Sequence, residues 1–542
     1  MCSSSSRSAA RLWLVLLALA TPTAYGQSFS GDNLGAIPDN TGTARSVTFL
    51  VSGVQRPLRS VQLSMALEHT WAGDVSATLV SPLGRARLLI FGRTGVQRGA
   101  TFGTARDLGG TYRFGDSFGT NWWTSAVQAT TLMPSGDFRS VTGGNQPSFH
   151  GGCPTHMDAV FGGLSAAEVN GQWTLLLTDS VTGDTGSISA ATLEIEQAPI
   201  AVFRSGFEAS EAGSGPGGNP VAPGLPPCQR TYADFDGNGL SDFVLVRAEG
   251  SNVRWSVVPN LGGEAVGTET SFLFGGTSDF FFELDYDGDG LSDPAIWVPG
   301  APGRYLVRRS GRPGGPPVEV PLGISGDDPI QAGDYDGDGR DDLALVSRPA
   351  SGVSGPHLLR IVPSRGGSER SLNLGTGASG SYFVVAGYDY NGDGLADGLT
   401  QRADPVTPAN GQFQLFSGMD ESLLTTFNLG LNSDFLLPGN RLGTRVSDIT
   451  VRRTIEGTRR HFSRDIAGGS NGAEVIFGVN NDYSLIGDFD GDGIDDYAVW
   501  RASTTPGASA FLFLRSSEPA LPPREVPMGA SGDYPVGSAR TR

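Results

Sequence analysis

Five short segments of this chain place an oxygen-bearing side chain at every second position, a spacing that suits a hard metal ion. Each spans nine residues and approximates Asp-x-Asp/Asn-Gly-Asp/Asn-Gly-x-x-Asp. Calcium takes six to eight oxygen ligands at roughly 2.3–2.6 Å. Side-chain oxygens at positions 1, 3, 5 and 9 and the backbone carbonyl of position 7 can supply them. Glycines at positions 4 and 6 allow the tight turn around the ion.

We name these segments the first to fifth acidic loops, in chain order. We expect about five calcium ions, one in each loop. The predicted ligands, at positions 1, 3, 5, 7 and 9 of successive loops, are Asp234, Asp236, Asn238, Leu240, Asp242, Asp285, Asp287, Asp289, Leu291, Asp293, Asp334, Asp336, Asp338, Arg340, Asp342, Asp389, Asn391, Asp393, Leu395, Asp397, Asp488, Asp490, Asp492, Ile494 and Asp496.

An EF-hand does not fit these loops, because none has the Glu that an EF-hand requires at position 12. Strand-like residues follow instead, as in Phe243-Val-Leu-Val246. Asp-Gly and Asn-Gly also form ordinary turns that need no metal. The charge count favours the metal, because the ligand positions hold eighteen acidic side chains and the formal net charge of the chain is −18. A bound cation would offset the repulsion within each cluster.

The loops recur about every fifty residues, with one interval of double length. A degenerate copy, 439–448, fills that interval, and Leu442 and Thr444 replace two of its acidic residues. We expect this copy to keep the fold without the ion. A second phrase, Gly followed by Asp-Phe or Asp-Tyr, precedes most loops, and a spare copy ends at Tyr534. This pattern predicts a six-bladed β-propeller over residues 228–542, closed by both chain ends in one blade, with seven blades as the alternative.

The N-terminus predicts export. Arg7 and Arg11 precede an apolar run from Leu12 to Ala20, and small residues stand at the −3 and −1 positions before Gln27. Residues 1–26 therefore fit a secretory signal, and we expect a secreted, extracellular protein, with a periplasmic or cell-surface location as the alternative. No later run is long enough to span a membrane. The acidic balance argues against binding of nucleic acid.

Two further residue types restrict the chemistry. The chain has no lysine, since all 38 basic residues are arginine, and this excludes Schiff-base and Ser-Lys catalysis. Cys153 and Cys228 are the cysteines left after removal of the signal. They form either a disulfide or two separate thiols.

Residues 198–227 are rich in Gly and Pro and predict a linker.

Residues 27–197 carry alternating apolar residues and predict a β-sandwich. His69-Thr-Trp-Ala-Gly-Asp74, Gly171-Gln-Trp-Thr-Leu175 and Gly183-Asp-Thr-Gly186 resemble the P domain (P/Homo B) of proprotein convertases. The resemblance implies a jelly-roll sandwich that accompanies a subtilisin-like serine protease. Only Gln27 to about Pro38 lie between the signal and the sandwich pattern itself, too few residues for such a protease.

The acidic loops resemble the FG-GAP or VCBS-type repeats of integrin-like β-propellers. The resemblance implies one calcium loop in each blade and an extracellular adhesive or ligand-binding role. The resemblance does not extend a calcium site to the degenerate copy, because that copy departs from the motif.

The predicted sandwich holds four more carboxylates in loop-like contexts, Asp74, Asp116, Asp179 and Asp184. They either share one further calcium ion or cap turns. His69 and Trp71 are interpreted as packing and turn residues.

Fragments that imitate a catalytic triad occur at His150, Asp184 and Ser278, but their order along the chain differs from that of subtilisin. His150 and His156 flank Cys153 without a fourth zinc ligand at suitable spacing. We therefore predict no catalytic residue. The sequence favours a secreted, calcium-binding, non-enzymatic adhesion or ligand-binding protein that recognises an extracellular glycan or protein. The alternative is a component of a subtilisin-like protease system, either a P domain that acts in trans on a protease or a cryptic hydrolase.

Overall fold

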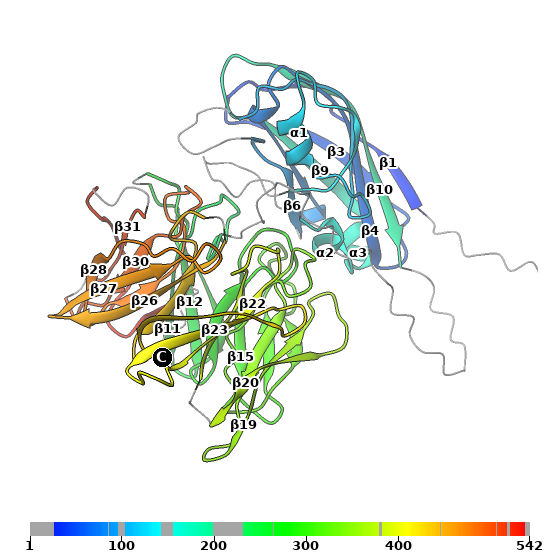
Figure 1. The fold of residues 1–542 in the computed structure, drawn as a ribbon. Coiled ribbons are helices and arrows are strands. Elements are labelled where there is room, and N and C mark those ends of the chain that lie inside the picture. Colours follow the sequence, from blue (N-terminus) through cyan, green and yellow to red (C-terminus); the bar gives the residue numbers. More distant parts are fainter. Residues whose placement is uncertain are drawn as a thin grey trace, which may run out of the picture.

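The prediction of an all-β chain is confirmed (Figure 1). The predicted signal before Gly26, His150, Cys153, Cys228 and residues 199–227 of the predicted linker lie outside the described part of the chain. The structure, a computed structural model, describes residues 26–84, 86–95, 103–141, 155–198, 231–263, 265–378, 382–444, 446–505, 507–516 and 521–536.

Residues 26–198 form two sheets, which we call the N-terminal unit. The first sheet has the order β1 (Gly26–Ser30), β10 (Gly186–Gln197), β4 (Leu58–His69), β7 (Leu108–Phe114) and β8 (Gly136–Phe138), with β2 (Gly35–Ile37) also on β10. The second has the order β3 (Arg45–Val51), β9 (Gly171–Asp179), β5 (Val75–Val80) and β6 (Arg87–Phe91). All pairs are antiparallel except β7 with β8.

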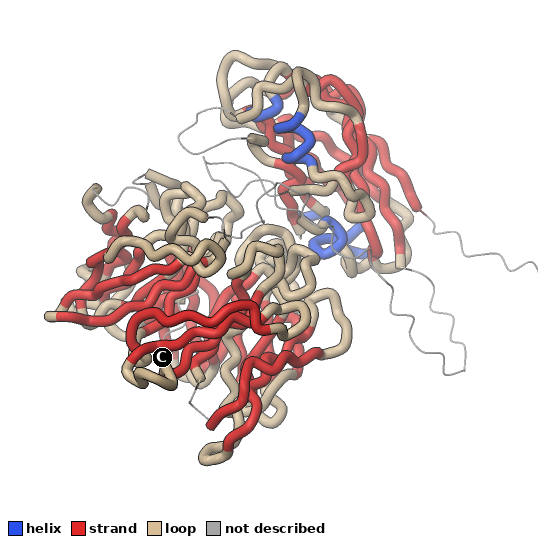
Figure 2. The backbone as a smooth tube through the Cα atoms, in the orientation of Figure 1, coloured by secondary structure: helices blue, strands red, loops and turns tan. Residues whose placement is uncertain are grey.

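One hydrophobic core joins these two sheets. The strand β4 buries every second side chain, as expected for a strand with one face on a core. Trp122 of the helix α1 (Trp122–Gln128) is fully buried and stacks on Phe91 with the ring centroids 4.4 Å apart. The remaining helical segments are η1 (Ala72–Asp74), η2 (Pro82–Gly84), α2 (Met157–Phe161) and α3 (Ala166–Val169). Figure 2 shows that the helices lie in this unit.

Residues 231–536 form six antiparallel sheets, each built almost entirely from consecutive strands. We call this part the six-sheet unit. Its sheets are β11 (Phe243–Glu249), β12 (Asn252–Val258) and β13 (Thr270–Gly276) with β33 (Tyr534–Pro535); β14 (Phe280–Leu284), β15 (Asp293–Val298), β16 (Arg304–Val307) and β17 (Val318–Pro321); β18 (Leu343–Ser347), β19 (Ser354–Val362) and β20 (Arg370–Ala378); β21 (Phe383–Tyr388), β22 (Asp397–Ala403), β23 (Asn410–Phe416) and β24 (Leu423–Leu431); β25 (Phe435–Gly439), β26 (Asp448–Ile455), β27 (Thr458–Arg464) and β28 (Val475–Val479); and β29 (Tyr483–Leu485), β30 (Tyr497–Arg501), β31 (Ala510–Leu514) and β32 (Arg524–Pro527).

The two ends of the six-sheet unit meet in its first sheet. The last strand, β33, pairs with β11, and Tyr534 lies opposite Val246. No copy of the Gly…Asp-Phe/Tyr phrase precedes the first acidic loop. The spare copy at the C-terminus takes that place and completes the first sheet. The degenerate copy, 439–448, joins β25 to β26 in a complete four-stranded sheet. No helix within the described ranges is long and apolar enough to cross a membrane.

The aspartate of the phrase that precedes the loops has a structural role. The carboxylates of Asp434, Asp482 and Asp533 each accept the backbone N–H of the residue three positions earlier, at 2.8 Å. Asp434 also pairs with Arg453, and Asp482 pairs with Arg501, nineteen residues later in both cases. These ion pairs fix the entry to the first strand of each sheet, β25 and β29. Sequence reasoning found the aspartates and missed the arginines, because no local pattern links residues so far apart.

Candidate functional site

The second, fourth and fifth acidic loops connect the first two strands of their sheets, whereas the first and third loops lead into β11 and β18. The carboxylate at position 1 organises each turn. In the second loop, Asp285 accepts the N–H of Gly288 at 2.8 Å through Oδ1 and the N–H of Gly290 at 2.9 Å through Oδ2. The same two bonds recur in the other four loops. Both glycines have φ between +71° and +87° in all five loops, which favours glycine.

The carboxylate at position 9 closes each loop against its own sheet. Asp293, fully buried, accepts the N–H of Tyr286 at 3.1 Å and the N–H of Ser310 at 2.6 Å. Equivalent pairs of bonds involve Asp242, Asp342, Asp397 and Asp496. Positions 1 and 9 therefore shape the loop as well as offering oxygens to an ion.

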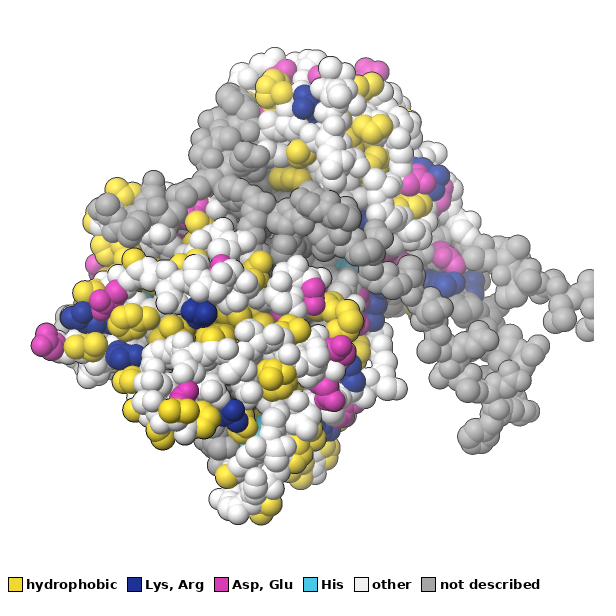
Figure 3. All heavy atoms as spheres, viewed as in Figure 1, with side chains coloured by type: hydrophobic (Ala, Val, Ile, Leu, Met, Phe, Trp, Pro, Cys, Tyr) yellow, Lys and Arg dark blue, Asp and Glu magenta, His cyan; other side chains and the backbone are white. Residues whose placement is uncertain are grey.

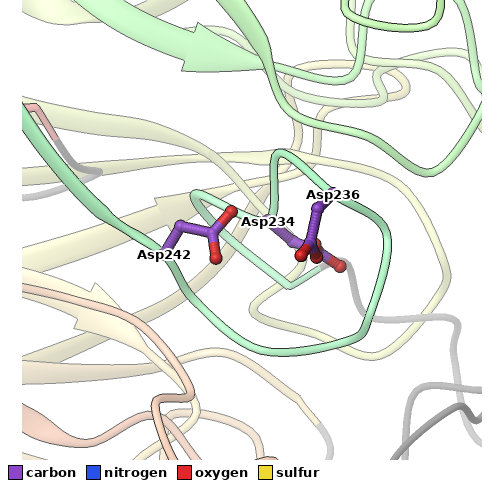
Figure 4. A group of neighbouring side chains, drawn as sticks. All are labelled: Asp234, Asp236 and Asp242. Atoms are coloured by element: carbon purple, nitrogen blue, oxygen red, sulfur yellow. The ribbon is translucent and has the colours of Figure 1, made fainter. Parts of the chain in front are cut away.

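Carboxylate oxygens converge in four of the five loops. In each, three aspartates place one oxygen apiece within 4.8 Å of the others. Figure 4 shows Asp234, Asp236 and Asp242 turned toward the space that the first loop encloses. The four groups are Asp234, Asp236 and Asp242; Asp285, Asp287 and Asp289; Asp334, Asp336 and Asp342; and Asp488, Asp490 and Asp492.

The second loop fits a divalent cation best. Asp287 is 3% exposed, and neither of its carboxylate oxygens accepts a hydrogen bond from the described residues. Asp289 is also buried, and its Oδ2 has no hydrogen-bond partner there. Burial of an unpaired carboxylate is costly, whereas a bound cation supplies the missing partner. On the face shown in Figure 3, acidic and basic side chains are scattered rather than gathered in one acidic patch.

Burial also changes the acidity of these loops. It raises the pKa of Asp234 to about 7, of Asp334 to about 8 and of Asp342 to about 9, and neighbouring carboxylates add to the effect. Burial raises the pKa of Asp293 and Asp496 well above the ordinary 3.8. Without a cation these loops retain protons near neutral pH, so protons compete with a metal for the same oxygens.

The fourth loop is arranged differently. The side-chain amide of Asn391 donates to Asp393 at 3.0 Å and to Asp397 at 3.3 Å, so its N–H group, not its oxygen, faces the carboxylates. Burial raises the pKa of Asp389 only to about 6. The aspartates of this loop are not among the converging groups of three, so this loop is expected to bind a metal more weakly than the other four.

The degenerate copy carries its own positive charge. Arg441 is 4% exposed and donates to the carbonyls of Leu437 and Pro438 at 3.2 and 3.3 Å. Burial raises the pKa of Asp448 to about 7, against the opposing effect of the Arg441 charge. Sequence reasoning noted the loss of acidic residues here and missed this buried arginine.

One of the two interpretations of Asp74, Asp116, Asp179 and Asp184 is that they share a calcium ion, but the four carboxylates do not form one group. Asp116 accepts the N–H groups of Met157 and Asp158 at 3.0 and 2.9 Å, and so caps α2. The interpretation of Asp116 as a ligand beside Asp74 is wrong, because its oxygens serve this helix.

Among the other three carboxylates, Asp179 and Asp184 act electrostatically on Asp74. Asp179 contacts His69 Nε2 at 3.1 Å, and Asp184 accepts the hydroxyl of Thr70 at 2.8 Å. Asp74 is fully buried and neither oxygen has a hydrogen-bond partner among the described residues. Burial, followed by the charge of Asp179, raises its pKa to about 6. Asp74 remains a candidate ligand on this geometry, and Asp184 holds a turn.

A cavity of about 1040 Å³ lies at the ends of β11, β14 and β21 that are opposite to the acidic loops. Its lining combines aromatic rings with charged side chains, and sequence reasoning missed it because it draws on strands of three sheets and on the loops between strands. The residues used below are Arg247, Phe280, Asp328, Arg348, Tyr382 and Tyr534.

Comparison with known proteins identifies no family. No protein-family model and no curated protein matches the chain. Among solved structures, the serine protease of Aeromonas sobria, alone and in complex with its chaperone, aligns at 16% identity with a TM-score of 0.19. Each alignment covers 32% of this chain and 26% of the protease. A likeness this low supports no conclusion about fold or function.

Asp287→Asn tests the metal assignment by the sign of its effect. In chelator we expect a higher melting temperature, because the amide removes a buried charge and costs no hydrogen-bond acceptor. In calcium we expect a lower one, because the loop loses a carboxylate ligand. By calorimetry, the melting temperature should shift by about 2–4 °C for each kcal/mol by which the substitution changes the free energy of unfolding.

The matched control is Asp293→Asn. Both oxygens of Asp293 accept backbone N–H groups, so this change should destabilise the protein in both conditions. Destabilisation by Asp287→Asn in chelator as well as in calcium would contradict the metal assignment.

Proposed function

We propose that this chain is an exported, calcium-binding, non-enzymatic protein that binds an extracellular glycan or protein. In this proposal the six sheets are the blades of a β-propeller of the FG-GAP type. The N-terminal unit is an accessory sandwich of the P-domain type. Calcium has a structural role in the loops, and the ligand binds elsewhere.

The convergence of buried carboxylates in four repeated loops is the observation that carries the proposal. Asp287 is the clearest case. Burial of a carboxylate without a hydrogen-bond partner costs free energy, and a nearby cation offsets this cost. The repetition of the same hydrogen bonds in every loop supports a role in stability rather than one reactive centre.

The cavity on the opposite side of the six-sheet unit is the proposed ligand site. Phe280 and Tyr534 line it and remain 41% and 56% exposed, so their rings are available to pack on a ligand. Arg348 pairs with Asp328 at 2.8 Å, and Arg247 pairs with Asp533 through two bonds. Such pairs offer donors and acceptors together, as hydroxyl groups of a glycan or peptide groups of a protein require.

Calorimetric titration of the full mature chain with calcium tests the metal half of the proposal. We expect at least four ions bound per chain, since four loops bring three carboxylates together. Absence of calcium binding at neutral pH would contradict it. A serine-directed fluorophosphonate probe provides a separate test, because covalent labelling of the chain would contradict a non-enzymatic role.

Arrays of extracellular glycans and matrix proteins, screened in calcium, test the ligand half. Tyr534→Ala should reduce binding of any positive ligand at least tenfold, because it removes an exposed ring from the cavity. Leu423→Ala, which alters a 52% exposed side chain of β24 outside the cavity lining, is the control and should leave binding unchanged. Equal losses in both variants would exclude the cavity as the site.

A further inference from the structure

The N-terminal unit touches the six-sheet unit at two acidic loops. The backbone N–H of His156, which directly precedes α2, donates to the carbonyl of Gly288 at 2.9 Å. The His156 ring nitrogen Nε2 contacts the carbonyl of Asp338. Gly288 is position 4 of the second loop and Asp338 is position 5 of the third. Figure 1 shows α2 at the end of its unit that faces the six sheets.

The contact at the second loop is close. A Cβ atom built on Gly288 would lie 2.7 Å from the ring carbon Cδ2 of His156, so only glycine permits this approach. Nearby, the backbone N–H of Arg87 in β6 donates to the carbonyl of Gly311, and a Cβ atom on Gly311 would meet Asp289. The N-terminal unit therefore packs against the backbone that surrounds the carboxylates of the second loop.

Burial distinguishes the loop covered in this way. Asp287, at position 3 of the second loop, is buried and only 3% exposed. The equivalent Asp236 and Asp336 are exposed. Asp287 also lacks a hydrogen-bond partner among the described residues, although it lies within a group of three carboxylates. The interface thus encloses a carboxylate cluster that the protein itself does not fully satisfy.

Arginines neutralise this interface only in part. Arg365 pairs with Asp338 at 3.2 Å, and Arg312 pairs with Glu168 of the N-terminal unit at 3.5 Å. The charges of Arg309 and Arg340 favour the ionised form of Asp287, yet the effect of burial is larger and its pKa is raised. A divalent cation in the second loop would supply the remaining positive charge.

We propose that the second and third acidic loops, when loaded with calcium, form the docking surface for the N-terminal unit. This inference rests on the calcium binding proposed above. Without the ion, the buried side chains of Asp287 and Asp289 lack a partner, so the second loop opens toward water and displaces the Gly288 carbonyl from His156. Because linkage is reciprocal, docking of the N-terminal unit in turn strengthens calcium binding at the second loop.

Hydrogen exchange on the full mature chain tests this inference at the His156 amide. In calcium this amide should be protected, and chelation should accelerate its exchange at least tenfold. Asp287→Asn should produce the same acceleration with calcium present. Asp490→Asn is the matched control, since it alters position 3 of the fifth loop and should leave the His156 amide protected. Small-angle scattering should show a larger radius of gyration wherever this protection is lost.

Calorimetric titration of the same samples separates this inference from the proposed function. If the wild-type chain binds no calcium, the proposed function fails. If Asp287→Asn loses one bound ion while the His156 amide stays protected, calcium binding stands and the docking inference is overturned. Equal loss of protection in Asp490→Asn would also overturn it.

His156→Ala provides a second route to the same conclusion, because it removes the ring contact with Asp338 and alters no predicted ligand. It should leave the number of bound ions unchanged and weaken one site at least threefold. Unchanged affinity at every site would contradict the reciprocal coupling.

Discussion

Removal of calcium is expected to lower the melting temperature of the six-sheet unit by about 10 °C or more. Each loop that binds calcium with a dissociation constant of about 10⁻⁴ M contributes about 1.4 kcal/mol at 1 mM calcium. Four or five such loops together contribute about 6–7 kcal/mol, a large fraction of the stability of an ordinary domain. Chelation also leaves buried aspartates such as Asp287 without a partner.

Differential scanning calorimetry with and without a chelator measures this effect. Calcium added back in excess should restore the original transition, whereas magnesium should restore it only in part. Magnesium requires near-ideal octahedral geometry and retains water, so it fits loops suited to the larger and less regular coordination of calcium poorly. A melting temperature that does not change on chelation would contradict a structural role for calcium in these loops.

In chelator, the stability of the protein is expected to fall as the pH rises from 5 to 8.5. Burial raises the pKa of Asp334 to about 8 and of Asp342 to about 9, against 3.8 for the ordinary carboxyl group. Between about pH 4 and pH 9 the folded state therefore binds more protons than the unfolded state. Linkage then requires the free energy of unfolding to decrease as the pH rises through this window. We expect a decrease in melting temperature of about 5 °C or more.

The same pH series in saturating calcium is the control. Calcium replaces the protons, so the difference in melting temperature between the calcium-loaded and chelated protein should widen as the pH rises. A melting temperature in chelator that stays level or rises over this range would show that the loop carboxylates are not buried as the structure has them.

Local patterns were enough to predict the strands and the turns. The alternation of apolar residues in β4 specifies a strand with one face on a core. The apolar runs after the first, second, third and fifth acidic loops specify strands that are buried at consecutive positions. The glycines at loop positions 4 and 6 adopt positive φ, which their residue type permits. Even the pairing of β33 with β11 followed from a repeated phrase at the C-terminus. Calcium binding and the family resemblances remain predictions.

Contacts between distant residues could not be predicted in this way. Asp116 has the residue type and loop context of a ligand, yet it caps α2, because the chain brings Met157 within reach of its oxygens. The arginine partners of Asp434 and Asp482 lie nineteen residues away and carry no local signature.

The sequence by itself determined the all-β class, the fifty-residue repeat and the set of oxygens that a metal could use. These features depend on residue type and spacing within a few positions, where backbone geometry alone relates one side chain to the next. Only the tertiary structure decided which carboxylates are buried without a partner, where the cavity lies and which loops meet the N-terminal unit. Burial and charge compensation depend on neighbours from several sheets, and no single segment of the chain specifies those neighbours.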